Sequence, residues 1–335
     1  MASSPLLAAP GAVAADEPDT GVAAHYGDPF AEQRALAGSA GLVDRGNRGV
    51  IRITGPDRLT WLHSLTSQHL ERLEPQHAVQ ALVLDPNGHV QHHLTLVDDG
   101  EAVWAHVEPG TAPALLEFLE SMRFMLRVEP ADVTGEYAVL SLLGPRSAEL
   151  APTGLVTMRE PFGIDMLVPR DQVSGIAGEI TAGGARLAGI WAYEALRIAA
   201  HLPRLGCDTD QRTIPHEVGW IGSAVHLEKG CYRGQETVAR VHNLGHPPRR
   251  LVMLHLDGSE DRLPGQGETV ELNGAAVGTV GSAARHYELG PIALALVKRT
   301  TPVEATLLAA GIAAAQEVVV PPDAGGEVKV ALRRR

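Results

Sequence analysis

The chain has 335 residues, of which 44% are hydrophobic and 20% charged, a balance typical of a folded protein with enough length for about two domains. Its formal charge of −12 argues against a broad nucleic-acid-binding face, which requires an excess of basic residues. The sequence contains no uninterrupted apolar run of about 18 residues, so it predicts neither a transmembrane helix nor a membrane-bound protein.

Residues 1–30 are expected to form a flexible tail. The first part of this segment is rich in alanine and proline, and Pro10 interrupts its apolar stretch. An export signal needs positive charge near its start, but the first basic residue is Arg34. Since Cys207 and Cys231 are the only cysteines, a disulfide framework is excluded and a reducing, cytoplasmic location is expected.

Residues 31–248 are expected to form one α+β domain made of two subdomains. The first part alternates strand and helix patterns, with strands at 50–54, 78–84, 90–97 and 102–107 and helices at 58–70, from Thr111 onward and at 191–200. A turn at 85–88 joins two of these strands as a hairpin. This order favours helices packed on a largely antiparallel sheet.

The pattern changes after Pro248. Short apolar stretches follow at 251–256, 269–272, 275–281 and 292–298, and glycine and proline separate them. We therefore expect residues 249–335 to form a small C-terminal β-barrel.

Residues 229–250 carry an excess of positive charge in a chain that is acidic overall. One acid, Glu236, stands there against five basic residues, which are Lys229, Arg233, Arg240, Arg249 and Arg250. Such a patch suits an anion, for example a polyglutamate tail, a phosphate or an acidic protein surface.

Cys231 lies between Lys229 and Arg233. Nearby cations favour the reactive thiolate form of a cysteine, so Cys231 is a candidate functional thiol. The alternative is that Cys231 is a small packed residue in a glycine-flanked turn. We expect Cys207, in a turn-like stretch, to be structural.

Three histidines near one strand, His89, His92 and His93, invite a metal site. Adjacent residues on a strand point to opposite faces, so His92 and His93 do not converge, and His92 shares its face with apolar residues. The sequence has no H-E-x-x-H and no C-x-x-C pattern, and we predict no metal site.

The most specific motif is Lys-Gly-Cys-Tyr-Arg-Gly-Gln-Glu at residues 229–236. It resembles the K-G-C-Y-x-G-Q-E signature of the YgfZ family, the folate-binding relatives of the glycine cleavage T-protein, an aminomethyltransferase. Residues 55–66, 196–198 and 214–217 are similar to further landmarks of that family, so the resemblance extends over residues 40–300.

The resemblance implies a fold of the T-protein type, with α+β folate-binding subdomains around a central cavity and a C-terminal β-barrel. It implies tetrahydrofolate or a derivative as the ligand. It also implies a role in the assembly or repair of iron–sulfur clusters in client enzymes, including enzymes that modify tRNA. Client proteins are then the partners, no direct nucleic-acid or membrane contact is expected, and Cys231 is the expected catalytic residue.

The resemblance also indicates where the folate binds. The expected ligand-binding residues are Arg197, Glu194, Glu217, Lys229, Tyr232, Arg233, Gln235, Glu236 and Arg240. Glu194 and Glu217 are included because the family's pterin-binding glutamate is Ala199 in this chain. The pterin ring carries N–H donors, so another carboxylate or carbonyl must accept them.

The acidic pair of the T-protein is also replaced, by His92 and His93. A neutral imidazole does not supply the negative charge of a carboxylate, so enzymatic activity stays open. Three functions remain: an accessory protein for iron–sulfur enzymes, a folate-dependent aminomethyltransferase, and a non-catalytic folate-binding scaffold with a structural Cys231. One cysteine cannot hold a cluster that needs about four ligands, so in the first case a partner would share it.

Overall fold

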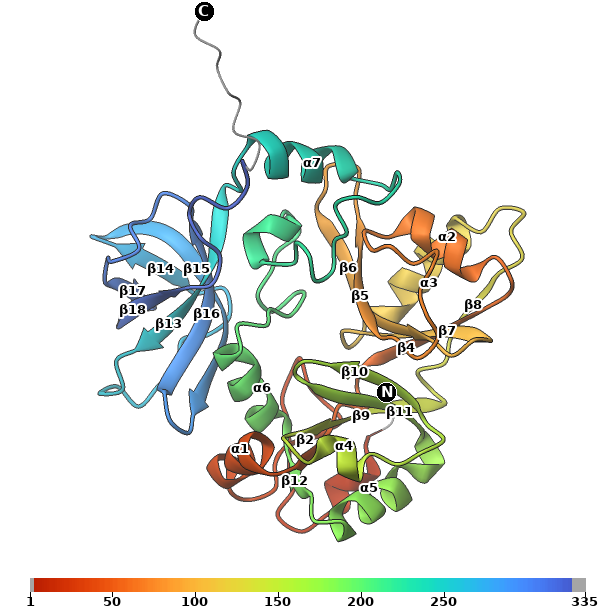
Figure 1. Cartoon of the computed structure of the whole chain (residues 1–335). Helices are drawn as coiled ribbons and strands as arrows, with labels where there is room; N and C mark the ends of the chain where they lie inside the picture. Colours follow the sequence, from red (N-terminus) through yellow and green to blue (C-terminus); the bar gives the residue numbers. More distant parts are fainter. Residues whose placement is uncertain (1–2, 327–335) are drawn as a thin grey trace, which may run out of the picture.

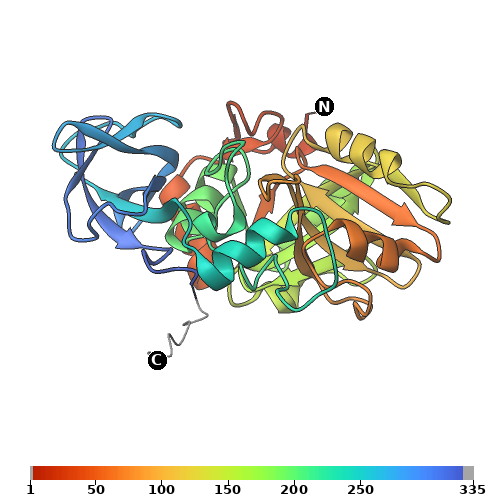
Figure 2. The ribbon, with the colours of Figure 1, turned by 90° about the horizontal axis from the view of Figure 1, so that it is seen from above.

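The computed structural model describes residues 3–326, and these residues form three lobes around a common centre (Figure 1). Two lobes are five-stranded sheets with helices on their outer faces, and the third is a closed six-stranded barrel. Seen from above, the barrel lies to one side of the two sheet lobes (Figure 2). The arrangement confirms the expected α+β fold with a C-terminal barrel.

The first lobe is the sheet β10-β11-β9-β3-β12. Its strands are β3 (Gly41–Asp44), β9 (Tyr137–Leu143), β10 (Val156–Glu160), β11 (Gly163–Pro169) and β12 (Arg186–Ala188). All neighbours are antiparallel except β12, which runs parallel to β3. The helices of this lobe are α1 (Pro29–Gly38), α4 (Ser147–Leu150) and α5 (Val173–Ala182), with a short 3-10 turn η2 (Arg170–Gln172).

The second lobe is the antiparallel sheet β5-β6-β7-β4-β8. Its strands are β4 (Gly49–Thr54), β5 (Val79–Leu84), β6 (Val90–Asp98), β7 (Ala102–Val107) and β8 (Glu129–Asp132). Helices α2 (Arg58–Leu65) and α3 (Ala112–Ser121) cover one face, and Leu62, Leu115 and Leu119 are buried against it. The leucines repeat at helical spacing, so they lie on one side of each helix. Their burial stabilises the packing of both helices on the sheet.

The two sheets pack against each other through a mixed interface. One part is apolar and joins Val50 and Trp104 of the second sheet to Met158 and Leu167 of the first. The other part is ionic and begins in residues 45–48, which connect β3 to β4 and so pass from one sheet to the other.

The barrel has the strand order β13-β16-β15-β14-β17-β18. Its strands are β13 (Arg249–Leu256), β14 (Thr269–Leu272), β15 (Ala275–His286), β16 (Gly290–Lys298), β17 (Leu307–Ala309) and β18 (Ile312–Val318). Between the barrel and the sheets lie α6 (Ile190–Ala199), η3 (Pro215–Val218) and α7 (Gln235–Leu244). In the described part of the chain, no helix has the length and apolar character needed to cross a bilayer.

The expected strands of the second lobe and the barrel are confirmed to within a few residues, and so is the helix near 191–200. Two expected helices are shorter. Helix α2 ends at Leu65, and α3 ends at Ser121, which leaves Phe124 and Met125 exposed on the following turn. The sequence patterns did not indicate α1, β3, β8 to β12, α4, α5, α7, β17 or β18.

The expected flexible tail at residues 1–30 is wrong for the described part of that segment. Residues 3–30 contain a 3-10 turn η1 (Pro5–Ala8), the paired strands β1 (Val13–Ala14) and β2 (Ala23–His25), and the start of α1. Leu6 is buried in the core of the first lobe, and Val22 is buried beside α6. Composition could not predict this order, because its cause is contact with residues more than 100 positions away.

One of those contacts is ionic and testable. Asp19 is buried and accepts hydrogen bonds from Arg204 at 2.9 Å and from Asn47 at 3.1 Å. We expect Asp19→Ala to lower the free energy of unfolding by about 2 kcal/mol, because both buried donors lose an acceptor. Urea denaturation measures this. The control is Asp16→Ala, since Asp16 is exposed and should change stability by less than about 0.5 kcal/mol. Equal effects of the two substitutions would contradict a docked N-terminal segment.

Candidate functional site

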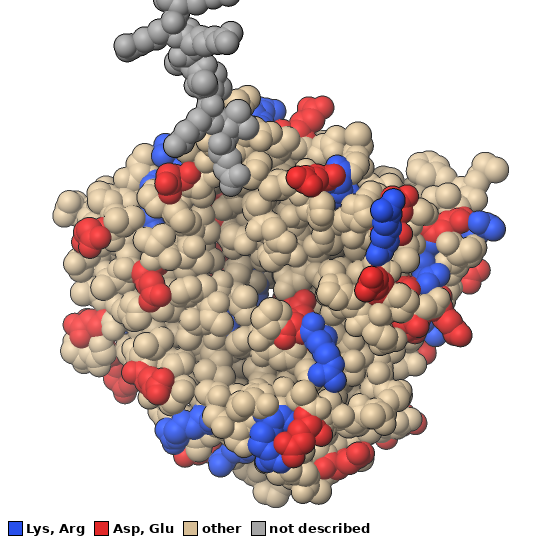
Figure 3. Space-filling view, in the orientation of Figure 1, with Lys and Arg blue, Asp and Glu red and all other residues tan. Residues whose placement is uncertain are grey.

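The surface is hollowed near its centre, where the three lobes meet (Figure 3). On the second sheet, the His93 ring of β6 lies 4.6 Å from the Trp220 ring, and His93 Nε2 lies 3.0 Å from Gln80 Oε1. Burial lowers the pKa of His93 to about 4, so the ring is neutral at pH 7. His93 and Trp220 therefore form an uncharged aromatic pair with one fixed edge.

The hydrogen-bond chain continues to the first sheet. Gln80 Nε2 donates to Glu160 Oε2 at 2.8 Å, which orients the Gln80 amide so that its oxygen faces His93. His93 Nε2 must then donate, and its Nδ1 is left as an acceptor. Burial raises the pKa of Glu160, which favours its neutral form. Gln80, His93 and Glu160 are all partly exposed, so the chain presents hydrogen-bonding groups beside an aromatic face.

Behind this chain lies a buried ion network, which starts at Asp165 on β11. Its carboxylate accepts from Arg45 at 3.1 Å and from Ser141 Oγ at 2.5 Å. Arg48 Nε donates to His106 Nδ1 at 2.9 Å, so His106 carries its proton on Nε2, which lies 2.9 Å from Asp165. Burial alone would raise the pKa of Asp165, but Arg45 and His106 outweigh it and hold it below its usual range.

The network continues through Glu108, which follows β7. Glu108 accepts from Arg48 at 2.7 Å and from Arg204 at 2.8 Å. Arg204 also binds Asp19, which in turn accepts from Asn47. Burial acts to raise the pKa of Glu108, but Arg204 and Arg48 dominate and keep the carboxylate ionised. The four segments that meet here are separated by up to 185 positions in the sequence.

Glu194 and Arg197, two of the expected folate ligands, are brought together as an ion pair. Arg197 lies 2.5 Å from Glu194 and 2.9 Å from Asp208, and Arg204 lies 3.0 Å from the second oxygen of Glu194. Arg197 is buried. Because Asp208 and Arg204 also hold this pair, it ties α6 to the segment that follows it. The expectation of a free pterin-binding carboxylate at Glu194 is not supported by these contacts.

Glu217 is likewise occupied. It is 1% exposed and accepts from Arg249 through both oxygens at 2.8 Å, and one oxygen also accepts from the Ile214 amide. Arg249 makes a second ion pair with Asp210 at 2.5 Å. These bonds attach η3 to the first barrel strand.

The expected basic patch at 229–250 is therefore wrong as a single surface. Arg249 is neutralised by two carboxylates, and Arg250 is fully buried in the barrel, where it donates to the Thr301 carbonyl. Arg233 and Arg240 remain exposed on the motif loop and α7. The positive charges are adjacent in sequence but separate in space.

In the 229–236 motif, the side chains of Lys229 and Tyr232 contact neighbouring elements and hold the loop in place. Lys229 Nζ donates to the carbonyls of His63 and Thr66 at the C-terminal end of α2, and it lies 4.8 Å from the Tyr232 ring. Burial lowers the pKa of Lys229 to about 8 and raises that of Tyr232 to about 12. Tyr232 packs against the cluster that contains Trp220, which places the motif beside the aromatic pair.

The end of the motif starts α7. Gln235 Oε1 accepts from the Tyr232 amide at 3.1 Å, and Gly234 has φ +82°. A Cβ on Gly234 would lie 2.6 Å from the Asp85 carbonyl oxygen, and one on Gly88 would lie 2.8 Å from Thr237. Only glycine permits this approach, so the motif is fixed against the β5–β6 hairpin that carries His93.

The remaining polar side chains of the motif face outward, and so does Arg240 on α7. Cys231, Arg233, Glu236 and Arg240 are exposed, and Arg233 lies 6.0 Å from the Phe118 ring. Cys207 is partly buried, and burial raises the pKa of its thiol to about 12. Of the two thiols, Cys231 is thus the accessible one.

Sequence reasoning missed Gln80, Glu160 and Trp220 beside His93, and it missed the ion network. A signal existed for part of the network. Glu108 and Asp165 are single acids next to or within apolar strands, and the 44–48 link has two arginines in a buried connection. Gln80 and Glu160 have no such signal, because their neighbours come from different lobes.

Two family models match the chain. The GCVT N-terminal domain matches residues 11–157, and the glycine cleavage T-protein C-terminal barrel domain matches residues 249–333. Together they cover more than two thirds of the chain.

The chain is also similar to individual proteins over most of its length. The chain is 28% identical to an aminomethyltransferase of Symbiobacterium thermophilum, over 81% of this chain and 82% of that one. It is 25% identical, over 75% of its length, to an Arabidopsis thaliana protein named as a chloroplastic transferase, of which it spans 65%. The crystal structure of the glycine cleavage system aminomethyltransferase T of Bartonella henselae superposes with a TM-score of 0.80 at 19% identity, covering 95% of this chain and 96% of that one.

The exposure of the two thiols predicts their reactivity. We expect Cys231 to react with a thiol probe at pH 7.5 at least about tenfold faster than Cys207, whose raised pKa and partial burial keep it a protected thiol. Labelling of Cys207→Ser and Cys231→Ser, each with one thiol left, measures the two rates separately. Equal rates would show that the local environments do not differ in solution.

Buried histidines predict a pH dependence of stability. Burial lowers the pKa of His92, His93, His106 and His216 to about 4, whereas an unfolded histidine titrates near about 6.5. Between these values the unfolded chain binds more protons, so the free energy of unfolding should fall as the pH drops from about 7 to about 4. Asp165 stays ionised in this window.

Urea denaturation from pH 7.5 to pH 5 tests this. His92→Leu should make the dependence shallower, because His92 is buried among apolar residues and its Nδ1 has no hydrogen-bond partner among the described residues. His77→Leu, at an exposed position, is the control. Identical slopes for wild type and His92→Leu would contradict the assignment.

Proposed function

Because this chain belongs to the T-protein-like family, we propose that it binds tetrahydrofolate and acts on a one-carbon unit as an aminomethyltransferase-type protein. Aminomethyltransferases of this family use tetrahydrofolate. The observation that carries the proposal is that both domains of the family follow each other in one chain, in a fold that superposes on a T-protein over nearly its whole length.

The residues around His93 fit a pterin. A pterin is a flat heteroaromatic ring with N–H donors and a carbonyl acceptor, and such a ring favours an aromatic face with a few hydrogen-bonding groups. The partly exposed His93 ring supplies the face and packs on the buried Trp220, and Glu160 and the Gln80 amide supply the polar groups. Gln80 and Glu160 would take the part of the glutamate that is Ala199 here. Tetrahydrofolate supplies the amine that carries the one-carbon unit.

His93 would act where the family has an acidic residue. Its neutral ring is held with Nε2 toward Gln80, so Nδ1 is available to accept a proton from a reacting amine. A neutral acceptor stabilises a developing positive charge less than a carboxylate does. The substitution therefore predicts slower transfer than in a T-protein with its acidic pair, not a different binding mode.

Binding can be tested before activity. We expect tetrahydrofolate to bind the wild type with a micromolar Kd, measured by calorimetry. Gln80→Leu should weaken this binding about tenfold, because it removes one hydrogen-bonding group and the bond that orients Glu160. Glu304→Gln, an exposed barrel position, is the control. Arg197→Ala is not informative, because it breaks a buried ion pair. No binding to the wild type would refute the folate part of the proposal.

Transfer is tested in a glycine-cleavage assay with a lipoyl carrier protein and tetrahydrofolate. We expect His93→Ala to lower kcat about 100-fold while tetrahydrofolate affinity changes only a few-fold, and His93→Asp to equal or exceed the wild type. His77→Ala is the matched control. Wild-type folate binding without any transfer would reject the transferase and leave a folate-binding scaffold.

A second candidate function rests on a different observation. The motif with exposed Cys231 resembles the YgfZ signature, and that resemblance implies maintenance of iron–sulfur clusters in client enzymes. In this case Cys231 would contact a client, since one cysteine alone cannot hold a cluster. Cys231→Ser should then lower the activity of iron–sulfur enzymes in cells but leave tetrahydrofolate binding intact, and Cys207→Ser should do neither. Unchanged client activity in Cys231→Ser would reject this function.

A further inference from the structure

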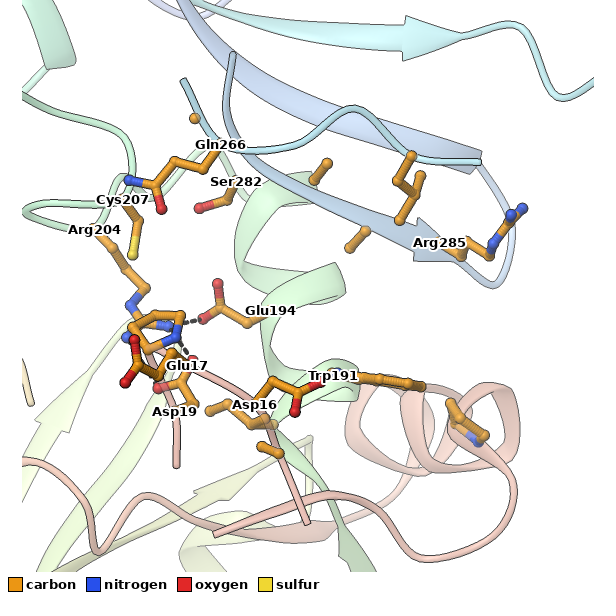
Figure 4. Close-up of a pocket in the computed structure, with 18 of the residues that line it drawn as sticks. Asp16, Glu17, Asp19, Trp191, Glu194, Arg204, Cys207, Gln266, Ser282 and Arg285 are labelled. Carbon is orange, nitrogen blue, oxygen red and sulfur yellow. Dashed lines mark hydrogen bonds and ion pairs between the residues drawn. The ribbon is translucent and has the colours of Figure 1, made fainter. Parts of the chain in front are cut away.

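A cavity of about 520 Å³ lies between the N-terminal segment, helices α1 and α6, and the barrel strand β15 (Figure 4). Its volume is in the range of small-molecule sites, and it lies where lobes meet, as such sites often do. Its apolar wall is formed by Phe30, Ile190, Trp191, Leu263 and Pro264.

The cations in the wall are already paired. Arg204 binds Asp19 and Glu194, which also line the cavity, and Arg285 binds Asp261 at 2.6 Å. These groups form closed ion pairs, so they contribute little net charge to the cavity.

The unpaired groups are acceptors. Asp16 and Glu17 are exposed at the cavity, and within residues 3–326 no side-chain hydrogen bond or ion pair engages them. Gln266 donates its Nε2 to the Gly206 carbonyl at 2.6 Å, which leaves its amide oxygen as an acceptor. Figure 4 shows Asp16 and Glu17 around the same space as Glu194, which is already paired with Arg197 and Arg204. A ligand in this cavity must therefore bring donors and positive charge.

Trp191 adds an aromatic surface. Its side chain is 52% exposed, whereas Trp61, Trp104 and Trp220 are 2%, 7% and 3% exposed. Its ring centroid lies 5.2 Å from that of His25, and the exposed remainder of the indole can bind an ammonium group through its face. Phe30, at the start of α1, is also exposed and extends the apolar surface.

Cys207 does not make this a covalent site. The pKa of its thiol is raised to about 12 by burial, so the thiol stays protonated near neutral pH. Binding in the cavity is non-covalent.

We propose that this cavity is a second ligand site, which binds a protonated amine with an apolar body. It is separate from the region around His93. Ala199 packs against the buried cluster that contains Trp220, whereas Glu194, five residues earlier on α6, lies about 140° around the helix and lines the cavity. The inference does not depend on the proposed folate function.

The test uses the full chain and 2-phenylethylamine as the probe, with calorimetry and tryptophan fluorescence as readouts. We expect saturable binding with a fluorescence change from Trp191, and at least about tenfold weaker binding of 3-phenylpropanoate, which has the same ring and the opposite charge. 2-Phenylethanol, the neutral analogue, should also bind more weakly. No saturable binding, or equal affinity for the amine and the acid, would overturn the proposal.

Variants locate the site. Asp16→Asn combined with Glu17→Gln should weaken amine binding about tenfold, and Trp191→Leu should remove the fluorescence change. Both changes are at exposed positions, and Glu117→Gln combined with Glu304→Gln, which removes the same two charges away from the cavity, serves as the charge-matched control. Unchanged affinity in the double variant would refute the site. If tetrahydrofolate displaces the amine probe, the cavity is the folate site and the proposal of a separate second site is overturned. If the protein does not bind tetrahydrofolate but still binds the amine, only the proposed function is refuted.

Discussion

The contact between Arg204 and Glu108 is the interaction on which the arrangement of the lobes depends. It links the segment after α6 to the second sheet, and through Asp19 it also fixes the N-terminal segment. A buried charge is costly unless it is paired, so each of these segments must be in place for the others to be stable. This requirement ties the sheets, α6 and the N-terminus into one cooperative body.

The same network sets the properties of the hollow at the centre. Because Asp165 and Glu108 are held ionised by arginines, their charge is compensated within the protein, and the groups left for a ligand are neutral or nearly so. His93 is neutral through burial, and Glu160 is shifted toward its neutral form. A fold similar to that of a T-protein thus surrounds a centre that carries little net charge. A flat, uncharged heterocycle suits that centre better than a free cation does.

The residues of the 229–236 motif fall into two groups, one that anchors the loop and one that faces solvent. Lys229, Tyr232 and Gly234 hold the loop against α2 and the β5–β6 hairpin, while Cys231 and Arg233 face solvent. A change in the first group would move His93, and a change in the second would alter only what meets the surface. The motif thus combines an anchored part with an accessible part.

The sequence by itself determined the fold class, the barrel, most strands of the second lobe, and the motif, whereas the exposure of Cys231 came from the structure. Periodic burial and turn residues are local signals, and a rare motif is local too. Only the tertiary structure decided which charges are free. Glu194, Glu217 and Arg249 are matched by partners far away in the chain, and Gln80, Glu160 and Trp220 meet His93 across lobes. The N-terminal segment is ordered for the same reason. Pairing depends on distances in space, which neighbouring residues do not encode.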